Sequence, residues 1–213
     1  MVMRTKPALV LASTLLLAFT APLFGEWDGC SIGQSSQSTI ETYSANSLAI
    51  TVSGAPLLGQ ADTLSFVSGP GKLTGDCEMI ARVMKISSGL QEWAAGGVMM
   101  RETLGDSSKF IAAACTRLHG VQVFMREKDD TEVVRQQDCA DCAPPLWLKI
   151  SRTGNHFAVF KSSDGIVWLQ IYQSDMAMKK SAWVGAFATN GGDRPPAVIT
   201  FDRLSARETG SQP

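Results

Sequence analysis

Residues 147–168 read WLKISRTGNHFAVFKSSDGIVW, and polar and apolar side chains alternate along most of this stretch. Alternation with a period of two is typical of β-strands that bury one face. It is interrupted by RTGN (Arg152–Asn155) and SSDG (Ser162–Gly165), which have the composition of hairpin turns. The stretch therefore predicts antiparallel strands that are joined by tight turns.

The same pattern recurs along the chain, and no helical period stands out after the first 25 residues. Twelve strands in a chain of 213 residues cannot all lie in one open sheet without curling. We therefore predict an all-β fold, an antiparallel two-sheet β-sandwich. The predicted strands are Leu48–Val52, Thr63–Val67, Cys77–Ile86, Gly97–Thr103, Phe110–Thr116, Val121–Arg126, Glu132–Arg135, Leu146–Arg152, His156–Lys161, Val167–Tyr172, Ala182–Ala188 and Val198–Leu204.

The N-terminus has the layout of a signal peptide. The positively charged segment MVMRTKP (residues 1–7) precedes the apolar run ALVLASTLLLAF (residues 8–19). That run is shorter than the roughly 20 residues that a transmembrane helix needs. We predict a signal peptide over residues 1–25, cleavage after Gly25, and a secreted or periplasmic product of the cell envelope without stable membrane insertion. A retained signal anchor is the alternative.

The remaining chain is predicted to be one domain. The sandwich occupies residues 26–206, and residues 207–213 form a disordered tail. The Ser/Gln-rich piece GQSSQSTIE (residues 33–41) is interpreted as a surface segment. The formal net charge is −1, and Arg4 and Lys6 belong to the predicted signal peptide. With no basic stripe to meet a phosphate backbone, nucleic acid is not an expected partner.

The sequence contains five cysteines, so at least one is unpaired or bonded between molecules: Cys30, Cys77, Cys115, Cys139 and Cys142. Cys139 and Cys142 lie in QQDCADCAPP, where a local disulfide is the first interpretation. Free thiols, a redox pair and half of a zinc site are the alternatives. A zinc site needs two more ligands, and the two histidines lack the spacing of a ligand pair, so we predict no metal. Cys77 and Cys115 are interpreted as small buried hydrophobic residues.

Several segments are familiar as an ordered set. They are QADTLSFVSGPGKLTGDCEMIARV (60–83), AAGGVMMRETL (94–104), GVQVFMRE (120–127), WLKISRTGNHFAVFKSSDGIVW (147–168), AWVGAFATN (182–190) and VITFDRL (198–204). Together they resemble the regulation-of-enolase-type domains of exported bacterial proteins, whose function is largely unknown. The resemblance covers most of residues 27–206. It implies the concanavalin A-like lectin/glucanase jelly roll and carbohydrate as the leading ligand class, and it does not imply catalysis.

The sequence offers no catalytic constellation. Retaining glucanases need two carboxyl groups about 5 Å apart, which on one strand gives an E-x-D-x-E-like run. The acidic residues Asp129, Asp130 and Glu132 instead lie in a polar turn, and no GxSxG motif is present. We therefore predict no catalytic residue and no cofactor.

Candidate ligand-binding residues are polar or aromatic groups in and beside strands. In AGGVMMRE and GVQVFMRE, the Val and Met side chains that point into the sandwich leave another set on the outer face of the sheet. On that face guanidinium and amide groups could meet sugar hydroxyls or carboxylates. The alternative is that the two arginines pair with Glu102 or Glu127. Trp93 is the best single candidate for ligand contact, because it follows a loop at the rim. The predicted set is Trp93, Arg101, Gln122, Phe124 and Arg126.

These observations favour a non-catalytic carbohydrate-binding module that acts outside the cytoplasm on a polysaccharide or glycan. The rival hypothesis is a structural or protein-interaction domain of the cell envelope, joined to partners through a free cysteine or a sheet edge. A glycoside hydrolase or lyase is the third hypothesis. From the sequence we expect Trp93→Ala or Arg126→Ala to weaken binding with little change in melting temperature.

Overall fold

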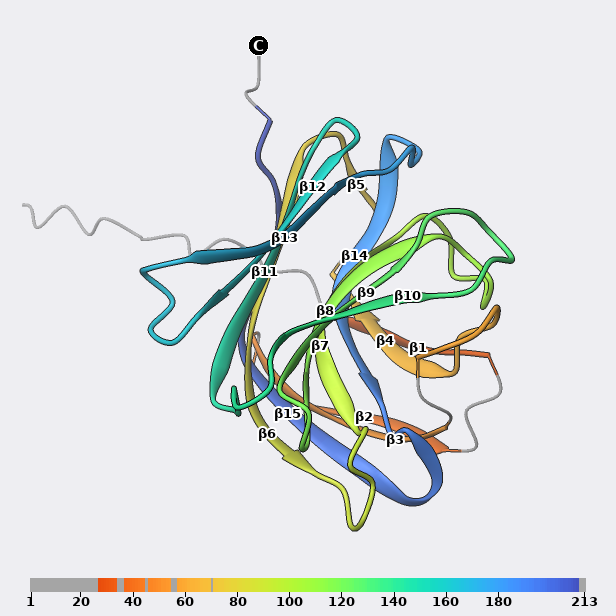
Figure 1. The fold of residues 1–213 in the computed structure, drawn as a ribbon, viewed down its shortest axis with the longest axis vertical. Helices are drawn as coiled ribbons and strands as arrows, with labels where there is room; N and C mark the ends of the chain where they lie inside the picture. The colour runs from red at the N-terminus through yellow and green to blue at the C-terminus, as the bar shows by residue number, and fades with distance from the viewer. Residues whose placement is uncertain (1–26, 34–36, 45, 55–56, 70, 211–213) are drawn as a thin grey trace, which may run out of the picture.

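The computed structural model describes residues 27–33, 37–44, 46–54, 57–69 and 71–210. These residues form two antiparallel β-sheets that pack face to face (Figure 1). The fold class predicted from the sequence is therefore confirmed. The predicted signal peptide lies outside the described residues. Within the described part, no helix is long and apolar enough to cross a membrane.

The first sheet has a seven-strand path, and one short strand pairs with β14 beside it. In spatial order the strands are β1 (Asp28–Ile32), β4 (Leu64–Ser68), β14 (Ser181–Thr189), β7 (Ala95–Arg101), β8 (Phe110–Thr116), β9 (Val121–Arg126) and β10 (Val134–Cys139), with β5 (Leu73–Thr74) on β14.

The second sheet has seven strands. In spatial order they are β13 (Leu169–Asp175), β12 (His156–Ser162), β11 (Leu146–Thr153), β6 (Cys77–Ser87), β15 (Gly192–Glu208), β3 (Ser47–Gly54) and β2 (Gln37–Ser44). In Figure 1, β11, β12 and β13 lie on the left, opposite β7, β8 and β9 of the first sheet.

The main core lies between the sheets and follows the predicted alternation. On β11, Leu146, Leu148 and Ile150 are buried, whereas Trp147 and Lys149 between them are partly exposed. The three buried side chains of β11 pack with the inward side chains of both sheets, which include Met79, Ala81, Val83, Val98, Met100, Ile111, Ala113, Val121 and Val123. Both predicted turns are present, since Gly154 and Gly165 adopt positive φ angles of 61° and 76°.

All twelve predicted strands overlap an observed strand, and three others were missed: β1, β2 and β5. β2 begins at Gln37, so part of the presumed surface segment 33–41 belongs to the second sheet. β15 extends to Glu208, two residues into the expected disordered tail. Its end is attached to the sheet, because Arg207 pairs with Glu78 and the backbone N–H of Thr74 donates to Glu208.

Candidate functional site

Four of the predicted ligand-binding residues lie on the outer face of the first sheet, as the alternation along β7 and β9 indicated: Val98 and Met100 on β7, and Val121, Val123 and Met125 on β9, point into the main core. They are nevertheless buried, so the expected exposed surface is wrong for this set. The exposed fractions are 0% for Arg101, 1% for Gln122, 5% for Phe124 and 0% for Arg126.

A loop over residues 57–63 covers this outer face. Leu57 of the loop is 1% exposed and packs in a second apolar cluster on the side of the sheet away from the main core. The other members of the cluster are Ile32, Leu64, Phe66, Ala95, Met99, Phe110, Ala112, Ala114, Phe124 and Phe187. β7, β8 and β9 are consequently buried on both faces.

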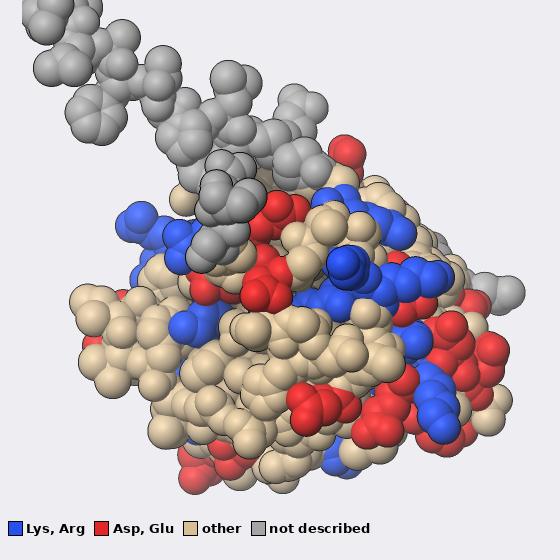
Figure 2. Space-filling model, turned by 90° about the horizontal axis from the view of Figure 1, so that it is seen from above, with Lys and Arg blue, Asp and Glu red and all other residues tan. Residues whose placement is uncertain are grey.

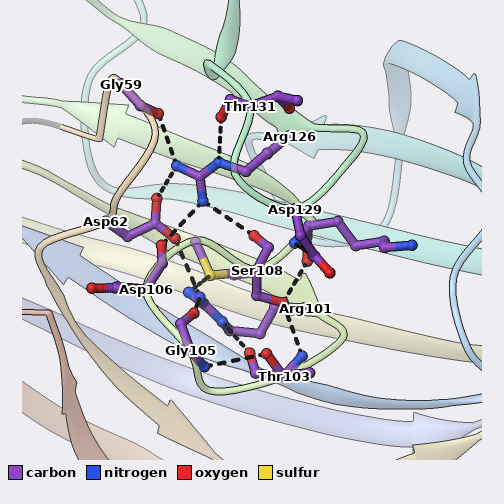
Figure 3. Close-up of polar contacts among 12 residues, drawn as sticks. Gly59, Asp62, Arg101, Thr103, Gly105, Asp106, Ser108, Arg126, Asp129 and Thr131 are labelled. Carbon is purple, nitrogen blue, oxygen red and sulfur yellow. Dashed lines mark hydrogen bonds and ion pairs between the residues drawn. The ribbon is translucent and has the colours of Figure 1, made fainter.

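A buried carboxylate holds the two arginines under this loop (Figure 3). Asp62 Oδ1 accepts from Arg126 Nη2 at 2.7 Å, and Asp62 Oδ2 accepts from Arg101 Nη2 at 3.2 Å. All three side chains are fully buried. The remaining acceptors are the thioether of Met99 and the backbone carbonyls of Gly59, Thr103, Gly105, Asp106, Ser108 and Thr131.

This network, which we call the Asp62 lock, ties three loops together. Its carbonyl dipoles offset the second positive charge that one carboxylate leaves unbalanced. Burial lowers the pKa of Arg101, although the adjacent Asp62 opposes the shift. Every nitrogen of both guanidiniums already donates, so neither arginine has a free nitrogen for a ligand. The expectation that Arg126→Ala would spare the melting temperature does not fit this burial.

The proposed alternative pairing of the arginines is also corrected. Their partner is Asp62, whereas Glu102 pairs with Lys109 and Lys179. Sequence reasoning missed Asp62 because a single acidic residue in a polar loop carries no local signal.

The opposite end of the same face remains at the surface. Trp93 precedes β7 and stacks on His119, with ring centroids 3.7 Å apart and an interplanar angle of 15°. The guanidinium of Arg135 lies 4.5 Å from the Trp93 ring. Trp93 is partly exposed and Arg135 is exposed. Arg101 lies at the far end of β7, so the structure separates Trp93 from the two buried arginines.

Polar groups surround the stacked rings. Gln122 Nε2 and Gln137 Nε2 donate to the backbone carbonyl of His119 at 2.6 and 3.3 Å. Glu92 Oε2 lies 3.4 Å from His119 Nε2. We call this group the Trp93 surface: Glu92, Trp93, His119, Arg135 and Gln137. Of this group the sequence singled out only Trp93, because His119 comes from the turn before β9, and Arg135 and Gln137 come from β10, all distant from Trp93 in the sequence.

The cysteines divide as predicted. Cys139 and Cys142 form a disulfide, which confirms the local interpretation of the CxxC segment. Cys77 and Cys115 are fully buried, and burial raises the pKa of Cys77 to about 11 and of Cys115 to about 12. Cys30 is half-buried, and burial raises its pKa as well. Cys30 is thus the most accessible of the three free thiols, and its raised pKa lowers the fraction of the reactive thiolate that a thiol-linked dimer would need.

The charged side chains do not form a metal centre in the part of the chain that the structure describes, where no three His, Cys, Asp or Glu residues are grouped to hold an ion. Asp129, in the acidic turn, accepts from the backbone N–H of Lys109 at 2.7 Å. On the end of the molecule seen in Figure 2, positive and negative side chains are interspersed.

No protein-family model and no curated protein sequence matches the chain. Solved structures resemble its fold. A functionally unknown protein from Saccharomyces cerevisiae superposes with a TM-score of 0.65 at 14% identity, covering 83% of this chain and 98% of that one. The carbohydrate-binding module CBM66 from Bacillus subtilis gives 0.57 at 14% identity, covering 87% and 98%. A legume lectin-like domain from Entamoeba histolytica gives 0.55 at 12% identity, covering 86% and 90%. The chain thus has the concanavalin A-like fold.

Proposed function

We propose that this chain is a non-catalytic carbohydrate-binding module of the regulation-of-enolase type, which binds a polysaccharide or glycan outside the cytoplasm. The Trp93 surface carries the proposal. It combines a partly exposed indole with a planar guanidinium, an amide and a carboxylate at one end of a face that is otherwise closed.

These groups suit a neutral sugar. An indole packs against the C–H face of a pyranose ring, and buried area supplies most of the affinity. A sugar that stacks on Trp93 takes the place of the Arg135 guanidinium, which then donates to the sugar hydroxyls. Gln137 donates and Glu92 accepts at the rim. The likeness to a carbohydrate-binding module and to a lectin-like domain supports the same ligand class.

The arrangement is consistent with binding and does not favour hydrolysis. The Trp93 surface has one carboxylate, Glu92, whereas glycoside hydrolysis uses two across the scissile bond. Asp62, the buried carboxylate of the same face, is already engaged by two guanidiniums. Neither group is placed to act as an acid with a partner nucleophile.

A glycan array followed by calorimetry on the best neutral hit tests the proposal. We expect Trp93→Ala to lower the affinity at least about tenfold, the equivalent of roughly 1.4 kcal/mol, because the stacking partner is removed. The matched control is Trp183→Ala: Trp183 lies opposite Arg101 in the β-register, at the far end of the same sheet. No binding to any neutral glycan, or equal binding by the Trp93→Ala variant, would contradict the proposal.

Export is tested separately. The full chain, expressed in a bacterium, should appear outside the cytoplasm with its N-terminus at Glu26. Retention of residues 1–25 in the mature protein would favour the signal-anchor alternative.

A further inference from the structure

The outer face of the second sheet carries an aromatic cluster that the Trp93 surface does not involve. On β11, Trp147 and Lys149 point away from the main core, because Leu146 and Leu148 point into it. Pairing with β12 places Phe160 directly opposite Lys149. Trp168 precedes β13 and lies over the same region. We call Trp147, Lys149, Phe160 and Trp168 the aromatic–lysine platform.

The platform holds an ammonium group between aromatic rings. Lys149 Nζ lies 4.3 Å from the centroid of the Trp168 ring and 4.6 Å from that of Phe160. Trp168 meets Trp147 edge to face, with centroids 6.5 Å apart and an interplanar angle of 81°. Cation–π contacts of this kind attract the ammonium group. They do not satisfy its three N–H donors as an acceptor oxygen would.

Lys149 also differs from the other cations near it in having no anion. Arg82 donates Nε to Asp202 Oδ1 at 2.7 Å, Arg207 pairs with Glu78, and Lys161 pairs with Asp138. Among the described residues, Lys149 has neither an ion pair nor a hydrogen bond to an acceptor oxygen. Burial lowers the pKa of Lys149, and the nearby Glu78 opposes the shift. An incoming carboxylate would supply the missing partner.

The platform is held in place before any ligand arrives. Asp164 Oδ1 accepts from the backbone N–H groups of Ile166 and Val167 at 2.8 and 2.9 Å, which fixes the turn that carries Trp168. Gly165 packs against Trp147 so closely that an added Cβ would lie 2.7 Å from the ring. Ordering costs on binding are therefore small. The turn also presents Ile166 and Val167, which are 81% and 73% exposed, as apolar contact area beside the rings.

We propose that the aromatic–lysine platform is a second ligand surface and that it binds polysaccharides built from uronic acids. The rings pack on the C–H faces of the sugars, and the Lys149 ammonium binds a uronate carboxylate. A polysaccharide with more than one negative charge on each sugar fits less well, because Glu78 and Asp202 lie on neighbouring strands of the same face and the formal net charge of the chain is −1. The surface lies on the other sheet from Trp93 and does not depend on it.

Calorimetry with sodium polygalacturonate and sodium alginate tests the proposal, and fully methyl-esterified polygalacturonate serves as the uncharged ligand control. We expect the mature protein to bind at least one of the two acids about tenfold or more tightly than the ester, and added salt should weaken the binding. Lys149→Met should lower the affinity for the acid at least about tenfold, Trp168→Ala should do the same, and Lys149→Arg should retain most of it.

Lys72→Met is the matched control, because Lys72 Nζ also lies over an indole, that of Trp183, 5.7 Å away on the first sheet. It should leave binding of the acid unchanged. Absence of binding to both acids, equal affinity for acid and ester, or wild-type affinity in Lys149→Met would each overturn the proposal. The proposal would also be overturned if Trp93→Ala lost acid binding while Trp168→Ala kept it. That result would assign the acid to the Trp93 surface instead. If the protein bound a uronic acid polymer through Lys149 but no neutral glycan, the proposed function of the Trp93 surface would fail and the proposal for the platform would be supported.

Discussion

The outer faces of the two sheets carry the same kinds of side chain and use them in opposite ways. On the first sheet, Arg101 and Arg126 share Asp62 and are completely buried. On the second sheet, Arg82 pairs with Asp202, and 29% and 24% of their side chains are exposed. Aromatic residues follow the same division: Phe110 and Phe124 lie beneath a loop, whereas Trp147 and Trp168 remain at the surface.

One loop accounts for the difference. Residues 57–63 lead into β4 and pass over the first sheet, where Leu57 packs in the second apolar cluster and Asp62 forms the Asp62 lock. The platform on the second sheet has no comparable cover among the described residues. The outer face of a strand with polar side chains therefore becomes part of a second core where a loop from elsewhere in the chain covers it. Where no loop covers it, the face stays available as a binding surface.

The largest expected effect is that of opening the Asp62 lock. Asp62→Asn keeps the shape of the side chain and removes its charge, which leaves two buried guanidiniums without an anion. We expect a loss of about 3–5 kcal/mol in the free energy of unfolding. For a domain of this size the melting temperature should fall by roughly 10 °C, as measured by calorimetry.

Asp106→Asn is the control for that substitution. The side chain of Asp106 is exposed, and its contribution to the lock is the backbone carbonyl that accepts from Arg126 Nη1 at 3.2 Å. It should change the free energy of unfolding by less than about 0.5 kcal/mol. If Asp62→Asn were equally mild, the backbone carbonyls alone would suffice to stabilise both arginines.

The second-largest expected loss of stability comes from the apolar contact of the loop 57–63. Leu57→Ala removes a fully packed side chain from the second cluster and should cost about 2–3 kcal/mol, because a surface loop can relax partly into the space. Leu58→Ala is the matched control, since Leu58 is 43% exposed. Chemical denaturation measures both. Equal, small losses would mean that the loop is held by the Asp62 lock alone.

The sequence predicted local features well. The strand pattern located β8 and β9 to the residue, Phe110–Thr116 and Val121–Arg126, because each is a short, mostly apolar run between polar or glycine-containing turns. The disulfide was predicted for a similar reason, since Cys139 and Cys142 are only three positions apart. β2 was missed because a Ser/Gln-rich strand has almost no apolar alternation.

The sequence did not predict what depends on distant contacts. Asp62 lies 39 positions from Arg101 and 64 from Arg126, so nothing near either arginine indicates that it will be buried. The stacking of Trp93 on His119 has the same origin. Trp93 lies just before β7 and His119 just after β8, and the antiparallel pairing of Ala95 with Thr116 brings these two positions together at one end of the sheet. Alternation assigns a side chain to a face of its sheet, but burial of that face is decided elsewhere in the chain.

The smallest expected loss of stability is on the outer face of the second sheet, where Arg82→Met removes an arginine–aspartate ion pair from a partly exposed position. The pair with Asp202 is bidentate, with Nε–Oδ1 and Nη2–Oδ2 distances of 2.7 and 2.5 Å, and the guanidinium lies 5.3 Å from the Trp147 ring. Water reaches both partners and screens their attraction, so the free energy of unfolding should fall by about 1 kcal/mol or less. The methionine retains much of the apolar contact with Trp147. Thermal unfolding beside Asp62→Asn measures the contrast directly: a loss in Arg82→Met as large as that in Asp62→Asn would mean that the second outer face is sealed like the first, and the platform could not admit a ligand.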